Sequence, residues 1–469
     1  MNGRSALHLR LNRSRQRGAI FITALGIIVI LSGLVLVFAQ DMRTEAIGSA
    51  NRMAYIRADA VERGAEQWVL AQVEASPGDA STITETPAEA IQISSGSAGG
   101  SGGGYFWLLR PNPDNDQQYD FGITDESGKL NVNVATQQQL LMFPNMTQEA
   151  ADAIVDWHDT AGAGGTDALY ASLPDAYVAK HADFETVEEL MLVDGVTPQM
   201  MYGNDRNRDG VVDDAERTAG AASGTGSMFS SGDSADRGLI HYLTAYSSEP
   251  DTRLNVDNTG NSTQFRTLLT SAGIDAARAS TIVSTWLSQR PRRGYRTLAT
   301  LNSVLRLRDP EIKVIADKVK FANRTAPLHR MNVGTASRDA MMTLGLDESD
   351  VDKLINSRDS ADTSTIAWVF DALGTAKALN LVDIITAHSY QYSADIVATS
   401  ADGRAFKRVR IVVDSSGVAS GTPAKIVYRK DLTGLGWPLP SDVRQSLRAG
   451  KGVVTGYART TGSGARLNF

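Results

Sequence analysis

Cysteine is absent from this chain of 469 residues, which excludes disulfide bonds, thiolate metal sites and cysteine nucleophiles. Clustered positive charge is also scarce, because 53 Asp and Glu outnumber 46 Lys and Arg and no long basic run follows the first residues. A dominant nucleic-acid interface needs clustered cations that displace phosphate counterions. We therefore expect no nucleic acid among the partners.

Signatures of catalysis are missing as well. The six histidines are scattered along the chain, and none forms a zinc-type pair at helical spacing. There is no serine elbow and no phosphate-binding glycine loop, since the glycines around Gly100 lie in a Ser/Gly-rich linker without strand-to-helix context. We therefore expect that the protein is not an enzyme.

The N-terminus combines a basic segment with one long apolar run. Arginines precede an uncharged, mostly apolar stretch from Ala19 to Ala39. At about 1.5 Å per residue, a helix of this length spans roughly 30 Å, the thickness of a bilayer core. The arginines should stay cytoplasmic, so the chain after Gln40 should be exported. The alternative is a secretory signal cleaved near Ala39, but the apolar region of such a signal is usually only about 7–15 residues long.

Beyond the apolar run, the pattern changes along the chain. Asp41 to Ser76 continues as an amphipathic helix, because apolar residues recur near helical spacing with charges between them. Pro77 to Gly104 is rich in Ser, Thr, Ala and Gly, which predicts a flexible loop. Period-two patterns then predict strands at 105–109, 119–124, 129–134, 390–399, 404–413 and 425–429, with a hairpin turn at 401–403.

An internal repeat occupies the middle of the chain. Three copies of a short Asn-containing motif recur, at 129–133, 253–257 and 330–334. A helical pattern with a short central break follows each copy, and the breaks lie at 143–146, 272–275 and 344–347. Self-similarity of this kind indicates one supersecondary unit used several times. The unit resembles a helix-hairpin-helix of the small all-helical (SAM-like) class. Because predicted strands precede and follow the repeats, we expect an α+β fold in which all-helical domains are inserted into a pilin-like antiparallel sheet.

One acidic loop has the spacing of a calcium site. Counted from Asp205, oxygen ligands fall at positions 1, 3, 5, 9 and 12 and glycine falls at position 6, as in an EF-hand loop. Position 7 would contribute its backbone carbonyl and position 12 a bidentate carboxylate. The expected ligands of a structural Ca²⁺ are Asp205, Asn207, Asp209, Val211, Asp213 and Glu216. A solvated surface loop is the alternative. Asp156, Asp159 and Asp167 form a second acidic group and a weaker candidate for a cation site, because they lack the spacing of a known metal-binding loop.

Seven groups of residues follow one another in an order typical of one family: 15–23, 121–131, 154–159, Asp167 with Tyr170 and Tyr177, 188–198, 242–246 and 254–256. On these residues, the chain resembles the K-type minor pseudopilins of type II secretion systems (general secretion pathway protein K). The resemblance covers the N-terminal two thirds of the chain, whereas a third Asn-Val unit and a long C-terminal stretch depart from the family's pattern.

The resemblance implies a single-pass protein of the bacterial inner membrane with most of its chain in the periplasm. Prepilin peptidase would remove the leader by cutting between Gly18 and Ala19. Most pilin-like subunits carry a glutamate where Thr23 stands here, and that glutamate neutralises the terminal amine of a neighbouring subunit. A tip subunit has no such neighbour, and a buried unpaired carboxylate is costly. The implied role is therefore at the tip of the pseudopilus, beside I- and J-type minor pseudopilins and in contact with secreted cargo.

The expected organisation follows from these patterns. It comprises a leader (1–18), a transmembrane and spine helix (19–76), a loop with the first pilin-like strands (77–134), a first helical domain with the calcium-like loop (135–235), a connecting strand segment (236–260), a second (261–328) and a third (329–388) helical unit, and C-terminal strands with a tail (389–469).

A membrane-anchored DNA receptor is the alternative function, because helix-hairpin-helix units also bind duplex phosphates in competence proteins. Asp275 and Asp347 argue against it, since they stand where phosphate would approach. The one basic cluster, Arg290, Arg292, Arg293 and Arg296, is more typical of a solvated face.

Overall fold

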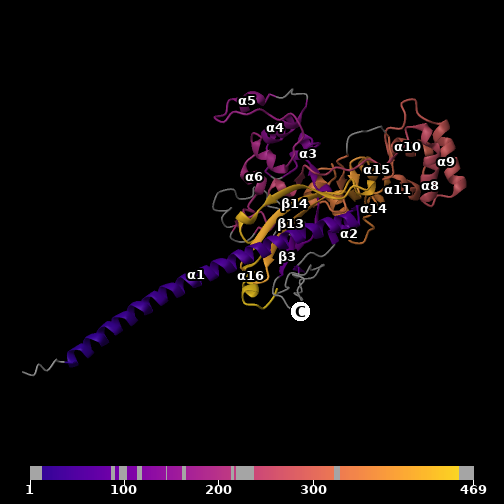
Figure 1. Ribbon diagram of the computed structural model, residues 1–469. Helices are drawn as coiled ribbons and strands as arrows, with labels where there is room; N and C mark the ends of the chain where they lie inside the picture. The colour runs from indigo at the N-terminus through magenta and orange to yellow at the C-terminus, as the bar shows by residue number, and fades with distance from the viewer. Residues whose placement is uncertain are drawn as a thin grey trace, which may run out of the picture.

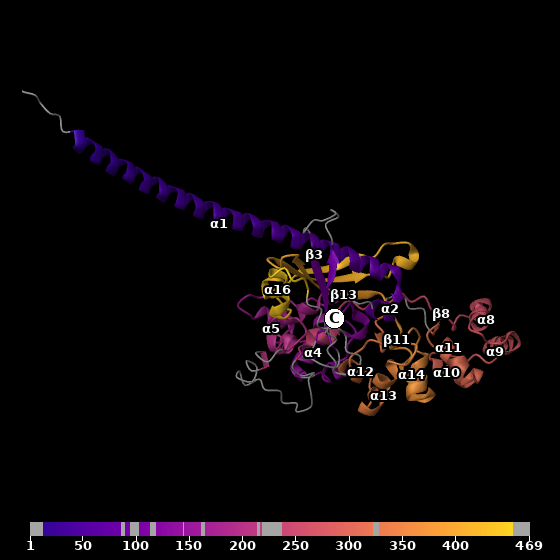
Figure 2. The ribbon, with the colours of Figure 1, turned by 90° about the horizontal axis from the view of Figure 1, so that it is seen from below.

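A long helix projects from a body of one main sheet, several two-stranded pairs and many short helices (Figure 1). The computed structural model describes residues 13–85, 90–93, 103–112, 119–143, 145–160, 165–212, 216–217, 237–321 and 328–453. The free end of the helix points away from the body, and its other end lies along the sheet (Figure 2).

Helix α1 (Arg13–Ala75) is continuous over 63 residues. The part beginning at Ile20 contains a window of mean hydropathy 2.9 that no part of the body covers, and it is long and apolar enough to cross a membrane. Further along, Val61, Ala65, Val69 and Val73 are buried at successive four-residue intervals. The N-terminal part of α1 is therefore apolar and exposed, whereas its C-terminal part buries only one side of the helix, as the sequence predicts.

The main sheet is antiparallel and contains residues from both ends of the chain. Its order is β15-β14-β13-β3-β2, β4 pairs with β3, and β5 pairs with β13. The strands are β2 (Ile91–Ile93), β3 (Gly104–Pro111), β4 (Tyr119–Phe121), β5 (Thr124–Asp125), β13 (Gln391–Ser400), β14 (Phe406–Asp414) and β15 (Lys425–Asp431). The expected strand near 105–109, the C-terminal strands and the hairpin are confirmed.

Helices cover both faces of this sheet. On one face, the buried side of α1 packs against Phe106, Leu108, Ile396 and Ile411. On the other face, Trp107, Leu109 and Val397 pack against Leu439, Val443 and Leu447, which belong to α16 (Ser441–Arg448) or the segment before it. Alternation along β3 and β13 produces the two faces, because successive side chains of a strand point to opposite sides.

Three helical units are inserted between β5 and β13. Each begins with a two-residue strand and ends with a parallel partner strand. Unit 1 is β6 (Leu130–Asn131), α3 (Gln137–Leu140), α4 (Gln148–His158), α5 (Asp167–Ala171), η2 (Val187–Leu192), α6 (Pro198–Tyr202), η3 (Leu239–His241) and β7 (Leu243–Thr244). Unit 2 is β8 (Leu254–Asn255), η4 (Thr259–Asn261), α8 (Ser262–Ser271), α9 (Ala276–Ser288), α10 (Leu298–Leu305), α11 (Asp309–Ile315) and β9 (Val319–Lys320). Unit 3 is β10 (Met331–Asn332), α12 (Arg338–Met342), α13 (Glu348–Arg358), α14 (Ala367–Leu373), α15 (Thr375–Leu381) and β11 (Ile385–Thr386).

The repeat is visible in atomic detail. In each motif, the asparagine side-chain oxygen accepts a hydrogen bond from the backbone N–H two residues on, for Asn131, Asn255 and Asn332. The valine that follows is buried in all three copies, at Val132, Val256 and Val333. The units share one continuous apolar core. The internal repeat is thus confirmed, and its assignment to the helix-hairpin-helix class stays a prediction.

Each helix pair turns through one left-handed residue. Asn145, Gly273 and Gly345 have φ values of +62°, +85° and +78° at matching positions. Two residues later, Thr147, Asp275 and Asp347 cap the next helix, and their side chains accept its backbone N–H groups. These breaks therefore end one helix and start the next, as expected.

Three expectations were wrong in detail. The strand expected at 129–134 shrinks to β6, because Asn131 binds the Asn133 N–H and turns the chain. The strand expected at 119–124 is split at Gly122, after which β5 pairs with β13 instead of β3. The loop expected at 77–104 contains β1 (Gly78–Asp79), α2 (Ala80–Glu85) and β2, because Asp79 binds Ser81 and Thr82 and Ile83 is buried. Three further short elements are β12 (His388–Ser389), η5 (Val418–Ser420) and η6 (Thr433–Leu435), while η1 (Glu126–Gly128) follows β5.

Candidate functional site

The acidic loop after α6 is organised by its own side chains. Asp205 accepts hydrogen bonds from the Asp209 and Gly210 N–H groups at 3.0 and 2.9 Å, and Asn207 accepts from Asp209 N–H at 2.8 Å. Gly210 has φ +89°, which a residue with a side chain rarely adopts. Glu216 folds back to the start of the loop, where its Oε1 accepts from the Arg206 N–H at 3.0 Å. The loop is therefore closed by hydrogen bonds between its own residues.

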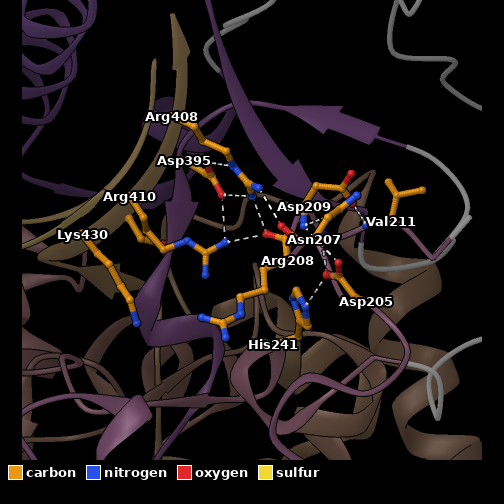
Figure 3. A network of polar contacts seen from close by, with 12 residues as sticks. Asp205, Asn207, Arg208, Asp209, Val211, His241, Asp395, Arg408, Arg410 and Lys430 are labelled. Carbon is orange, nitrogen blue, oxygen red and sulfur yellow. Dashed lines mark hydrogen bonds and ion pairs between the residues drawn. The ribbon is translucent and has the colours of Figure 1, made fainter. Parts of the chain in front are cut away.

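This loop docks on the main sheet through the guanidinium groups of Arg408 and Arg410, and Arg410 donates to the Arg208 carbonyl at 3.3 Å (Figure 3). Arg408 of β14 is fully buried, and it donates to both carboxylate oxygens of Asp395 on β13, at 2.9 and 2.7 Å. It also donates to the backbone carbonyls of Asn207, at 2.7 Å, and Arg208. Arg410 adds a bond to Asp395 at 2.9 Å. Sheet and loop thus share one network of charge-assisted hydrogen bonds.

The electrostatics of this network are set by burial and by the arginines. Burial alone would raise the pKa of Asp395, but Arg408 and Arg410 outweigh it and hold that pKa below its usual range. On the far side of the loop, His241 Nε2 lies 3.4 Å from Asp205 Oδ2. Burial lowers the pKa of His241 in spite of this carboxylate. The imidazole of His241 and the buried guanidinium of Arg408 flank the loop from opposite sides (Figure 3).

The expected calcium ligands divide into described and undescribed residues. Asp205, Asn207, Asp209, Val211 and Glu216 all lie on this one loop, whereas Asp213 falls outside the described residues. Asp205 and Asp209 are almost fully buried, at 1% and 4% exposure. Within the described ranges, no three acidic or histidine side chains converge closely enough to form a metal cluster. The donor set is all oxygen, the kind that Ca²⁺ prefers, so these residues fit a calcium ion in chemistry and order.

The second acidic group is organised around a histidine. His181 Nε2 lies 3.1 Å from both carboxylate oxygens of Asp167, and its Nδ1 lies 3.1 Å from the Asp159 carbonyl oxygen. The hydrogen bond that His181 donates to the Asp167 carboxylate raises the pKa of His181. Asp156 is bonded to Thr166. These aspartates therefore have protein partners.

The expected cleavage site lies within helix. Gly18 and Ala19 belong to α1, which begins at Arg13. Thr23 donates its hydroxyl to the Ile20 carbonyl at 2.9 Å, which satisfies this polar group within the helix. A peptidase that cut between Gly18 and Ala19 would first have to unwind the start of α1.

A pair of buried carboxylates that the sequence did not single out joins the units to the sheet. Asp125 accepts from Asn332 of unit 3 at 2.9 Å and from Ser389 at 2.7 Å. Glu126 accepts from Lys129 at 2.8 Å and also from Thr244 and Ser393. Burial raises the pKa of Asp125. Burial would do the same to Glu126, but Lys129 and the two hydroxyls outweigh it and lower its pKa.

A family model matches one part of the chain. Residues 123–203, which span the carboxylate pair and most of unit 1, match the family model for protein K of the type II secretion system, first domain. No curated protein matches the chain. Among solved structures, the GspK-GspI-GspJ complex of the enterotoxigenic Escherichia coli type 2 secretion system is similar. That match has 10% identity, a TM-score of 0.32, and coverage of 83% of this chain and 99% of the other.

The identity and the TM-score of the solved structure are too low to bear on function. The family match stands without it. Residues 123–203 include or overlap four of the stretches from which the sequence suggested the family, namely 121–131, 154–159, Asp167 with Tyr170 and Tyr177, and 188–198. The resemblance to protein K of the type II secretion system is thus confirmed by the family match over residues 123–203.

Proposed function

We propose that this protein is a minor pseudopilin that caps the periplasmic pseudopilus of a type II secretion system and has a structural role in protein export. The observation that carries the proposal is helix α1, which is exposed and apolar from Ile20 onward and later packs on an antiparallel sheet. The apolar part suits both a bilayer and the helices of neighbouring subunits. Its partners would be I- and J-type minor pseudopilins and secreted cargo.

Two of the three units support a structural role over DNA binding. Asp275 and Asp347 sit at the starts of α9 and α13, where their carboxylates accept the backbone N–H groups that a phosphate would need. Their negative charge also repels a phosphate. We accordingly propose neither nucleic-acid binding nor catalysis for this chain.

Processing by prepilin peptidase tests the proposal first. We expect the intact mass of the membrane-extracted protein to fall by residues 1–18 when an active peptidase is co-expressed, with Ala19 as the new N-terminus. A variant with Gly18→Leu is the control and should stay uncleaved. An unchanged mass with active peptidase would contradict pseudopilin processing, and cleavage near Ala39 would indicate a secretory signal instead.

We further propose that the loop beginning at Asp205 binds one Ca²⁺ that orders this inserted loop between α6 and η3 of unit 1. A ligand that binds only the folded state raises the melting temperature in proportion to the logarithm of its concentration. We expect millimolar Ca²⁺ to raise the melting temperature of the protein, Mg²⁺ to raise it much less, and Glu216→Gln to abolish most of the rise. Equal shifts in the wild type and in Glu216→Gln would exclude this loop as the site.

A further inference from the structure

The basic residue that opens each repeat motif has a carboxylate partner. Lys129 Nζ lies 2.8 Å from Glu126. Arg330 is bound more completely: its Nε and Nη2 hold Glu249 at 2.9 and 2.6 Å, and its Nη1 donates to Asp317 at 3.0 Å. In unit 3, two carboxylates therefore occupy all three nitrogens of the guanidinium.

The equivalent residue of unit 2, Arg253, is bound only in part. Its Nε donates to Asp251 at 3.0 Å, and its side chain is 9% exposed. Its Nη1 is buried without any hydrogen-bond partner. A buried charged donor without an acceptor costs free energy, and such groups in folded proteins usually indicate a missing ligand, ion or water. Compared with Arg330, the feature that Arg253 lacks is a second carboxylate.

Arg253 lines a cavity of about 540 Å³ between unit 2 and the start of β13. Lys318 and Lys320 also line it, and Lys318 is exposed. The two acids of its wall, Glu249 and Asp317, are already held by Arg330. Asp251 is the acid that offsets the three cations, and it contacts Arg253 at 3.0 Å and Lys320 at 3.4 Å. The uncompensated charge at this cavity is therefore positive.

The apolar part of the wall accommodates more than a small ion. Leu254, Leu268 and Tyr390 line the same cavity, and its volume is within the range of pockets that enclose whole ligands, about 300–1,000 Å³. An arginine fork matches a carboxylate bidentately, and carboxylates of peptide chains are often captured in this way. A carboxylate attached to a short stretch of chain would fit both the charge and the apolar wall.

We propose that this cavity binds a carboxylate presented by a partner polypeptide, either an acidic side chain or a chain end, with Arg253 as its fork and Lys318 and Lys320 as supporting cations. The inference is independent of peptidase processing and of calcium binding. It assigns unit 2, which lies at the end of the body away from the free end of α1, a role in partner recognition (Figure 1).

Peptide binding to the full-length, detergent-extracted chain tests this proposal. The probes are two fluorescent hexapeptides, hexaglutamate with both ends blocked and a neutral peptide with a free carboxyl end, followed by fluorescence anisotropy. We expect at least one to bind, and we expect succinate to compete better than sulfate at equal ionic strength. The peptide that binds identifies the source of the carboxylate.

Matched variants locate the site. Arg253→Met should weaken binding about tenfold or more, the loss typical of a charge-assisted hydrogen bond. Lys318→Glu should weaken it several-fold, and because Lys318 is exposed this variant keeps the test valid if Arg253→Met does not fold. Arg296→Gln, an exposed arginine of the same unit outside the cavity, should leave binding unchanged. Absence of binding by both peptides, equal competition by sulfate, or equal affinities for Lys318→Glu and Arg296→Gln would overturn the proposal.

Discussion

Arg408 bonds to the carbonyl of Asn207, 201 residues earlier in the chain, and to Asp395 on the adjacent strand. Its side chain is fully buried, so water cannot replace these partners. Removing one member of a buried ion pair leaves the other charged and unpaired, which is more costly than the loss of an exposed pair. At the scale of single residues, Arg408 thus connects the acidic loop to the sheet by bonds that water does not replace, and Arg410 adds one more bond to the Arg208 carbonyl.

We expect Arg408→Met to lower the free energy of unfolding by about 3–5 kcal/mol, because Asp395 stays buried with its charge only partly balanced by Arg410. Arg410→Met is the matched control, since Arg410 bonds to the same carboxylate but is 21% exposed, and its effect should be clearly smaller. Urea unfolding of both variants measures the difference. Equal losses of unfolding free energy in the two variants would contradict the expectation that the more deeply buried arginine stabilises the fold more.

The sequence predicted the loop but not the network that holds it. Asp205, Asn207, Asp209 and Glu216 stand at fixed spacing within one loop, so local order was enough to identify them. Asp395 and Arg408 belong to strands of ordinary alternating pattern, and nothing local indicates that their side chains meet a loop from elsewhere in the chain. Asp125 and Glu126 were noticed as part of a motif, and their role as a junction depends on distant hydroxyls and amides.

At the scale of elements, the left-handed residue in each helix pair is the shared feature of the units. Gly345 has φ +78° with open space around it, so a side chain there would be strained without clashing. Asn145 adopts the same conformation with a side chain, at φ +62°. Glycine enters this region at little cost, and other residues pay about 1 kcal/mol.

Opposite substitutions at these equivalent positions should therefore have opposite effects. Gly345→Ala should lower the free energy of unfolding by about 1 kcal/mol, and Asn145→Gly should leave it unchanged or raise it slightly. Chemical denaturation monitored by circular dichroism tests both. Stabilisation by Gly345→Ala would contradict the assignment of a shared turn.

Element types were predictable where the pattern was long, and boundaries were not. Helix α1 and the hairpin of β13 and β14 follow from runs of many residues. The two-residue strands that close the units, such as β7 and β11, carry no periodic signal, because they are defined by pairing with β6 and β10. Asn131 shows the limit most clearly, since one side-chain hydrogen bond turned an expected strand into a turn.

At the scale of the whole molecule, α1 is joined to the edge of the sheet by charge as well as by packing. Glu62 of α1 is 1% exposed and lies 2.9 Å from Arg429 of β15, which also binds Glu66. Burial, followed by the hydrogen bond with Glu66, raises the pKa of Glu62 from 4.5 to about 7 although Arg429 opposes the shift. At a pH between 4.5 and about 7, the Glu62 carboxyl therefore keeps its proton in the folded protein and has lost it in the unfolded chain.

This proton makes stability depend on pH. Between pH 4.5 and about 7 the folded state binds more protons at Glu62 than the unfolded state, so the contribution of this residue to stability falls as pH rises through that window. Glu62→Gln removes the titration and should be more stable than the wild type at pH 8, with little difference at pH 4.5. Melting temperatures across this range provide the test, with Glu45→Gln, an exposed position on the same helix, as the control. Parallel profiles for Glu62→Gln and the wild type would contradict a raised pKa at Glu62.

The insertion of all three units between β5 and β13 also sets an order for folding. Each unit closes on a strand of its own, so its internal contacts can form as soon as that unit has been synthesised. The sheet is different, because β3 must wait for β13 and thus for nearly the whole chain. Until then, the face of α1 that carries Val61 and Val69 can pack only on β3 and its neighbours, without β13 and β14. The packing of α1 is therefore completed only when the last strands arrive, and a chain that lacks them would leave part of this apolar face in water.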